Sequence, residues 1–196
     1  MFQEGLSMVL AAESDLLVVA KASNSAEAVT EFRKHKPDLA LMNQYFCGTA
    51  GIGLDALISI RAEFPSARIV ILTNVDGDAE IQRALRAGAA SYVLKSVPKS
   101  ELLEVIRSVH RGRKRIPADV AARLAEHAGE EDLTNREIDV LTLIRDGQSN
   151  KQIADRLAIA ETTVDFHVRN LVGKLQANGR THAVTIAIRR GLLRLI

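Results

Sequence analysis

The first 110 residues alternate short apolar runs with longer amphipathic stretches. Each run is rich in Leu, Ile and Val, which is typical of buried strands. The expected strands are 16–20, 39–42, 69–72 and 91–94, and the expected helices are 25–35, 53–63, 78–87 and 99–111. Ser25 and Ser100 are candidate helix caps, and Gly88 is a candidate helix stop. Strands that alternate with helices predict a doubly wound α/β fold, in which helices cover both faces of a parallel sheet.

Residues 132–196 carry only helical patterns. Thr134 and Glu137 form a capping box ahead of an apolar run, and Gly147 is placed to end that helix. Three further helices are expected at 150–157, 162–175 and 181–190. Residues 112–131 hold a basic run and a short amphipathic pattern, which we interpret as a linker. The chain is therefore predicted to contain an α/β domain over 1–111, a linker over 112–131 and an all-α, four-helix domain over 132–196.

Charge is distributed unevenly along the 196 residues, although the formal net charge is only +2. Residues 1–131 hold 16 Lys and Arg against 17 Asp and Glu, a net of −1, whereas residues 132–196 hold 10 against 7, a net of +3. This excess permits nucleic-acid binding by the second domain. The single cysteine, Cys47, excludes an intramolecular disulfide and a multi-cysteine zinc site. No leader peptide and no apolar run of about 18 residues is visible, so we expect a cytoplasmic protein without membrane contact.

The third helix of the second domain has two unlike faces. Steps of about 100° per residue place four apolar residues on one stripe, which we expect to be buried. These are Val164, Val168, Leu171 and Leu175, and the opposite face holds Thr162, Phe166, Arg169, Asn170 and Gly173, with Lys174 to one side. In a DNA major groove, Phe166 could touch a thymine methyl group and Arg169 could reach guanine or phosphate. Packing of Phe166 on a neighbouring domain fits the same pattern, and the pattern alone leaves both interpretations open.

The second domain resembles the LuxR-type helix-turn-helix. The resemblance covers LTNREIDVLTLIRDGQSNKQIADRLAIAETTVDFHVRNLVGKL from Leu133 and NGRTHAVTIAIRRGLL from Asn178. It implies a scaffold helix at 150–157, a recognition helix at 162–174, and dimers on inverted DNA half-sites that pair through 181–190. It also implies base-reading positions at Asp165, Phe166 and Arg169, and backbone-contact positions at Lys151, Thr162, Thr163, Asn170 and Lys174.

Asp165 departs from the pattern of that family, which usually has Lys at this position. A carboxylate near phosphates is repelled, but it can accept a hydrogen bond from the N4 amino group of cytosine. Asp165 is therefore expected either to weaken DNA binding or to change the preferred sequence.

Residues 1–111 resemble the CheY-like receiver domain of NarL/FixJ-type two-component response regulators. The resemblance covers MFQEGLSMVLAAESDLLVVAKASNSAEAV from residue 1, PDLALMN from Pro37, ARIVILTN from Ala67 and GAASYVLKSVPKSELLEVI from Gly88. In that family an Asp at the end of the third strand accepts a phosphoryl group. Two acidic residues after the first strand hold Mg²⁺. Thr73 and Lys95 match the Thr/Ser and Lys that bind the phosphoryl group.

The phospho-acceptor position of this receiver is Asn43, and an amide nitrogen is not a nucleophile. The sequence also begins in what should be the first helix, so the family's first strand and acidic pair are missing, and residues 44–49 replace a short loop. Control by Asp phosphorylation is therefore not expected. Thr73 and Lys95 are then more simply explained as hydrogen-bonding groups at the edge of the sheet. We expect no catalytic residue, metal or cofactor, and the chain is not expected to be an enzyme.

The leading hypothesis is a sequence-specific, DNA-binding transcription regulator whose receiver serves as a dimerisation or docking module. Its expected partners are duplex DNA, a second copy of the chain, and a sensor kinase or other regulatory protein. Two alternatives remain. One is a protein-interaction factor whose DNA binding is weakened by Asp165, and the other is an ordinary phospho-switch that carries Asn at position 43.

The missing first strand would lie between strands 16–20 and 39–42 in the CheY-like strand order. Three arrangements are open: a native start upstream, direct pairing of 16–20 with 39–42, or coverage of the gap by a partner chain. Of these, pairing or partner coverage is favoured, because Asn43 independently indicates a phospho-site that no longer operates.

Overall fold

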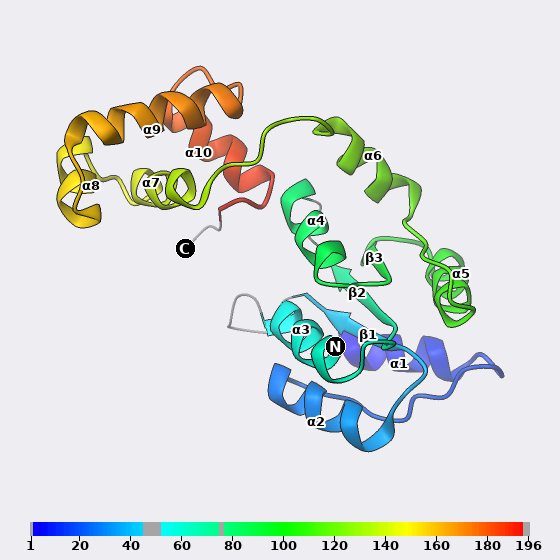
Figure 1. Ribbon diagram of the computed structural model, residues 1–196. Helices are drawn as coiled ribbons and strands as arrows, with labels where there is room; N and C mark the ends of the chain where they lie inside the picture. Colours follow the sequence, from blue (N-terminus) through cyan, green and yellow to red (C-terminus); the bar gives the residue numbers. More distant parts are fainter. Residues whose placement is uncertain (1, 45–51, 75–76, 194–196) are drawn as a thin grey trace. The chain divides into compact units, whose positions relative to one another are not determined.

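A computed structural model describes residues 2–44, 52–74 and 77–193 of the chain (Figure 1). The chain divides into two compact units, Met1–Asn74 with Ile81–Ala121, and Val75–Glu80 with Ala122–Ile196. Cys47 and most of the loop expected at 44–49 lie outside the described residues. Each unit contains its own cluster of buried apolar side chains.

The first unit contains a parallel sheet of three strands within the described ranges, in the order β1 (Ala40–Asn43), β2 (Ile69–Thr73) and β3 (Ser91–Leu94). In the register of the sheet, Ala40 lies opposite Ile69 and Val70 lies opposite Ser91. All five residues of β2 are buried, as expected for the central strand of a sheet covered on both faces. These three strands confirm the sequence prediction to within one residue at each end.

Helices cover both faces of this sheet. They are α1 (Phe2–Ala11), α2 (Ser25–His35), α3 (Ile52–Glu63), α4 (Asp78–Arg86) and α5 (Lys99–His110). On one face, Val70 and Leu72 pack with residues of α1 and α5 such as Leu6 and Val105. Ile69 and Ile71 alternate with them and so point to the other face. Figure 1 shows α1 and α3 on opposite sides of the sheet.

Two of the predicted helix caps are wrong by one or two positions. Asn24, and not Ser25, caps α2: its side-chain oxygen accepts a hydrogen bond from the Glu27 backbone N–H at 2.9 Å. Asn24 has the extended backbone that an N-cap needs, whereas Ser25 is already helical. The predicted cap Ser100 lies inside α5, because Pro98 ends the preceding loop and starts the helix without a side-chain cap. Gly88, with φ of +101°, follows α4 as predicted.

The segment 16–20 is not a strand, so the sequence prediction is wrong there, and direct pairing with β1 does not occur. Leu17 is 84% exposed, and Val18 and Val19 are also exposed. A strand requires a neighbour for its backbone N–H and C=O groups, and this segment has none in the described sheet. Its apolar sequence gives it strand propensity, but pairing decides whether a strand forms.

We expect the amide hydrogens of residues 17–19 to exchange with solvent much faster than those of Val70 to Leu72. Within the part of the chain that the structure describes, the first set has no sheet partner, whereas β2 is bonded on both sides. Hydrogen exchange followed by mass spectrometry measures both segments in one experiment. Protection of residues 17–19 close to that of β2 would contradict the structure. If that protection rose with protein concentration, a second copy would be covering the segment.

The second unit is helical, with α6 (Ala118–Glu126) at the division between the units, followed by α7 (Asn135–Arg145), α8 (Asn150–Leu157), α9 (Glu161–Lys174) and α10 (Arg180–Arg189). Its core is aliphatic. The fully buried members are Val140 and Leu141 of α7, Ile153 of α8, Val164 and Leu171 of α9, and Ala183 and Ala187 of α10. The four helices predicted after residue 132 are confirmed to within about one residue at each end.

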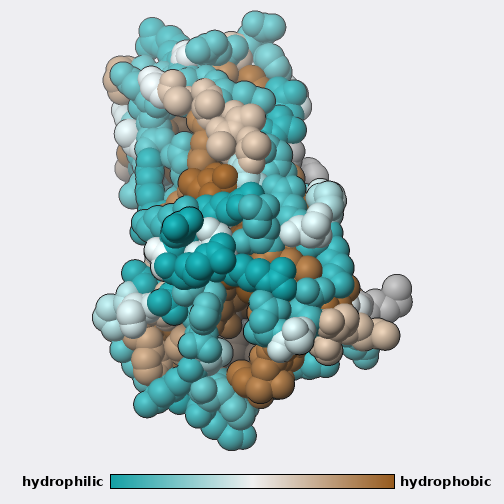
Figure 2. Space-filling model, turned by 90° about the vertical axis from the view of Figure 1, so that its right-hand side faces the viewer, coloured by the Kyte–Doolittle hydropathy of each residue, from teal (hydrophilic) through white to brown (hydrophobic). Residues whose placement is uncertain are grey.

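Exposed apolar residues are scattered over the surface. On the face drawn in Figure 2, hydrophobic residues form separate patches between hydrophilic ones. Over the ranges that the structure describes, no helix is long and apolar enough to cross a membrane. Phe166 of α9 is one of the exposed large hydrophobic residues, with 53% of its surface accessible.

Candidate nucleic-acid interface

Helix α9 buries one stripe of its surface and exposes the other. Val164 and Leu171 are fully buried, Leu175 just beyond the helix is 5% exposed, and Val168 packs against the same core. The predicted buried stripe is therefore confirmed. Because this stripe is fixed by contacts with α7 and α8, the rotation of α9 about its own axis is fixed as well.

The outward face of α9 carries side chains that were predicted to contact the bases or the backbone of DNA. Phe166, Arg169, Asp165 and Thr162 are exposed, and Asn170 is partly buried. The Phe166 ring lies edge-on to the His167 ring, with 5.7 Å between their centroids. An apolar ring flanked by donors and an acceptor, all facing solvent, can make both apolar and polar contacts with a partner.

Helix α8 and the turn after it set the start of α9. Ser149 and Gln152 form a capping box at the start of α8, where each side chain accepts from the other's backbone N–H. Ala158 ends α8 in the left-handed region with φ of 52°, which turns the chain sharply toward α9. Lys151, a predicted backbone-contact residue, is exposed in the first turn of α8, and Thr163 is partly buried in the first turn of α9.

A chain of hydrogen bonds links three helices at this surface. Arg180 of α10 donates to the Gln148 carbonyl at 2.7 Å and to the Asn150 side-chain oxygen at 3.1 Å. Asn150 at the start of α8 donates to the Asp165 carboxylate of α9 at 2.6 Å. Sequence reasoning singled out Asp165 but missed its bond to Asn150 and the bond from Arg180 to Asn150, since contacts over 15 and 30 residues leave no periodic signal.

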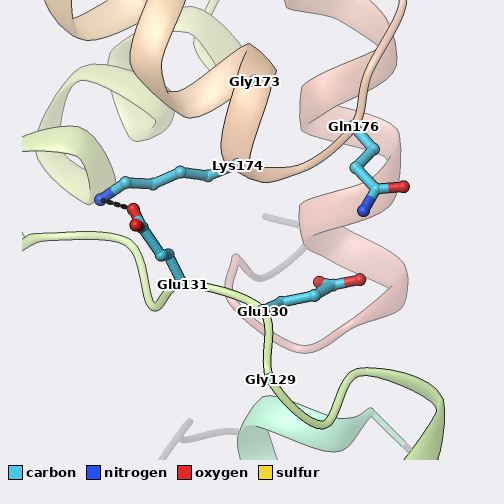
Figure 3. A pocket seen from close by; sticks show the side chains of 6 residues that line it. All are labelled: Gly129, Glu130, Glu131, Gly173, Lys174 and Gln176. Atoms are coloured by element: carbon cyan, nitrogen blue, oxygen red, sulfur yellow. Dashed lines mark ion pairs between the residues drawn. The ribbon is translucent and has the colours of Figure 1, made fainter.

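Lys174 differs from the other predicted phosphate-contacting residues because its charge is matched within the domain. Its Nζ lies 3.0 Å from the Glu137 carboxylate and 3.8 Å from that of Glu131, and it donates to the Asp132 carbonyl at 3.2 Å. Figure 3 shows Lys174 reaching toward Glu131. Both residues line a hollow of about 340 Å³. A phosphate would have to compete with these carboxylates for the Lys174 ammonium.

Glu137 is the buried centre of this arrangement, with only 3% of its surface exposed. Burial raises the pKa of Glu137, but the Thr134 backbone N–H, the Lys174 ammonium and the Thr134 hydroxyl oppose this, and the net result is a lowered pKa. The predicted capping box is thereby confirmed, with the Glu137 carboxylate accepting from the Thr134 N–H at 2.8 Å. The same carboxylate ties the end of α9 to the start of α7.

We expect Glu137→Gln to lower the free energy of unfolding by about 1–3 kcal/mol at neutral pH, because a charged hydrogen-bond acceptor is lost. A carboxylate with a lowered pKa stabilises the fold above its unfolded-state pKa, and this contribution disappears as the pH falls through its folded-state pKa. The difference in the free energy of unfolding between variant and parent should therefore shrink below about pH 4. Urea unfolding over a pH series measures this difference, and Glu161→Gln, at an exposed position, is the control. A gap that stays constant with pH would refute this role.

In the first unit, Asn43, Thr73 and Lys95 come together at the carboxyl edge of the sheet. Asn43 is the last residue of β1, and the fully buried Thr73 is the last residue of β2. Lys95 directly follows β3, and its backbone N–H donates a hydrogen bond to the Thr73 carbonyl at 2.7 Å. The Lys95 ammonium lies over the ring of Phe2, 4.3 Å from its centre. Beside them, the buried Tyr92 hydroxyl donates to the Gln44 side chain at 2.6 Å.

The three residues described at this edge do not fit a magnesium ion. Mg²⁺ is held in proteins mainly by carboxylate oxygens, and the three residues at this edge supply an amide, a hydroxyl and an ammonium group. Within the described ranges, no group of three His, Cys, Asp or Glu side chains is placed to hold a metal ion. Asn43, Thr73 and Lys95 by themselves therefore supply no carboxylate ligand for Mg²⁺.

Comparisons with known proteins match both units. The family of response regulator receiver domains matches residues 1–107, and the family of bacterial regulatory proteins of the luxR type matches residues 131–187. The response regulator protein VraR of Staphylococcus aureus (strain NCTC 8325) is 32% identical over 98% of this chain and 94% of its own length. The transcriptional regulatory protein LiaR of Bacillus subtilis (strain 168) is 33% identical over the same shares.

Solved structures agree with this assignment. The response regulator ChrA of a heme-sensing two-component system is 31% identical, with a TM-score of 0.55 over 98% of this chain and 93% of that one. RcsB, solved as two dimers bound to two parallel DNAs, is 21% identical and shares the fold with a TM-score of 0.71 over 95% and 92% of the two chains. The chain therefore belongs to the DNA-binding transcription regulators of the response-regulator type, in which a receiver domain is joined to a LuxR-type helix-turn-helix domain.

Proposed function

We propose that this regulator binds a specific duplex sequence as a homodimer, with α9 in the major groove, and that its receiver acts without phosphorylation at position 43. The observation that carries the proposal is the outward face of α9, where Phe166 is 53% exposed on the side opposite a fully buried stripe. An α-helix fits the major groove, where an aromatic ring can contact thymine methyl groups and Arg169 can donate to guanine.

Helix α10 supports the homodimer part of the proposal. Its buried side carries Ala183 and Ala187, and Thr181, Thr185 and Arg189 form an exposed stripe four residues apart on another side. Such a stripe is free to face the same helix of a second copy about a two-fold axis. RcsB is known as dimers on DNA, and the shared fold makes the same arrangement reasonable for this chain.

The receiver part of the proposal rests on Asn43 and on the absence of carboxylates among the three residues at the sheet edge. A sensor kinase or another regulatory protein would then act through the surface of the receiver rather than through a phosphoryl group at position 43.

A protein-interaction factor with weakened DNA binding is the second candidate, because Asp165 puts a negative charge on the outward face of α9. Selection of bound duplexes from random-sequence DNA, followed by gel shifts at rising salt, separates the two. We expect enrichment of inverted half-sites and an affinity that falls steeply with salt, as phosphate contacts require. Failure to enrich any sequence, or an affinity that does not change with salt, would favour the second candidate.

A further inference from the structure

The Asp165 carboxylate is held in a fixed direction by the chain of hydrogen bonds from Arg180. A guanidinium can only donate, so the Asn150 oxygen faces Arg180 and the Asn150 amino group must face the other way, toward Asp165. The resulting bond to the carboxylate is short, 2.6 Å, as expected of a charge-assisted hydrogen bond. Two residues from two other helices therefore orient one exposed acid on α9.

A positively charged side chain lies close to Asp165 on the outward face of α9. Arg169 lies one helical turn further along the same face and donates, at 3.5 Å, to the Asp165 backbone carbonyl. The outward face of α9 thus presents an acceptor and a donor one turn apart, rather than an isolated negative charge. A residue whose only role is to repel phosphate would gain nothing from a fixed orientation.

The exposed edge of cytosine in the major groove fits an oriented carboxylate best. Cytosine presents an N4 amino donor there, whereas guanine presents two acceptors and thymine one acceptor and a methyl group. Adenine presents an amino donor too, but its N7 acceptor lies beside it and would repel a carboxylate. An acceptor at position 165 and a donor at position 169 therefore favour a cytosine near a guanine in each half-site.

We propose that Asp165 is a specificity-determining residue that selects cytosine at one position of each half-site, and that Asn150 and Arg180 are positioning residues for its carboxylate. This inference rests on the proposed function, since it requires α9 to lie in the major groove.

Selection from random-sequence duplexes tests the proposal, using the 196-residue parent chain, Asp165→Asn and Asn150→Ala. The parent should prefer cytosine at one position by roughly 5- to 150-fold. Asp165→Asn, which keeps the size of the side chain and adds a donor, should change that preference from cytosine to adenine. Asn150→Ala should reduce the cytosine preference severalfold and leave the preferences at the other positions unchanged, an effect that a general loss of stability would not produce.

The possible results are distinguishable. If Asp165→Asn raises the affinity for all sequences equally and moves no base preference, Asp165 only repels phosphate and the inference is overturned, although the proposed function stands. If Asn150→Ala reduces the base preference at every position of the site by the same factor, Asn150 is not a positioning residue for this base. If the parent enriches no sequence, the proposed function fails and the inference fails with it. Circular dichroism of each variant confirms that it is folded before selection.

Discussion

Arg169→Ala is expected to weaken binding to the selected site by about 1–3 kcal/mol, or roughly 5- to 150-fold, and to relax the sequence preference at one position. Arg169 is exposed on the outward face of α9, four residues from Asp165 and three from Phe166. From there its guanidinium can donate two hydrogen bonds to guanine O6 and N7. Fluorescence anisotropy with labelled duplex measures the affinity, and repeated selection measures the preference.

The matched control for this substitution is Arg83→Ala, which removes the same charge from an exposed position on the receiver helix α4. It should change the affinity little, because it lies outside the DNA-binding domain. Lys151→Ala gives a useful contrast. Loss of a phosphate contact should weaken binding to all sequences alike and reduce the slope of log affinity against log salt concentration by about 1. If Arg169→Ala leaves both affinity and preference unchanged, α9 does not lie in the major groove.

Acetyl phosphate with Mg²⁺ is expected to leave the chain without an added phosphoryl group at position 43. The amide nitrogen of Asn43 is not a nucleophile, and neither Thr73 nor Lys95 supplies a carboxylate for the ion. For the same reason Asn43→Asp alone should not restore phosphorylation, because neither Thr73 nor Lys95 would give the ion a second carboxylate ligand. Intact-mass spectrometry of the parent and of this variant measures the result.

A phosphorylation-competent response regulator treated in parallel is the positive control for this experiment. A stable gain of one phosphoryl group on residues 1–111 of the parent would contradict the proposed receiver mechanism. The same gain in Asn43→Asp alone would support the alternative of an ordinary phospho-switch that carries Asn at this position.

Local signals in the sequence predicted the parts of the fold that local contacts decide. The capping box of Thr134 and Glu137 is present as predicted, and β3 has the predicted bounds, because a short run rich in β-branched and aromatic residues is typical of a buried strand. Gly88 ends α4 in a conformation that favours glycine. Asn24 was overlooked as a cap because its neighbour Ser25 belongs to the same class of capping residue.

Contacts between distant residues explain what sequence reasoning missed. Residues 16–20 have the composition of a strand, but whether they pair depends on a neighbour that propensity does not describe. The helical wheel correctly placed Phe166 and Arg169 outward, since it needs only the position of the buried stripe. It could not show that Asn150 orients Asp165 or that Glu137 pairs with Lys174, because those partners come from other helices.

Chemical probing of guanine N7 on the selected DNA site tests the central claim most directly. Dimethyl sulfate methylates this atom in the major groove, where Arg169 is proposed to bind. We predict protection of guanines in two inverted half-sites, spaced by about one helical turn or a multiple of it, and loss of that protection with Arg169→Ala. Guanines that react equally with and without the protein, at concentrations where the duplex is fully bound, would contradict major-groove reading by α9.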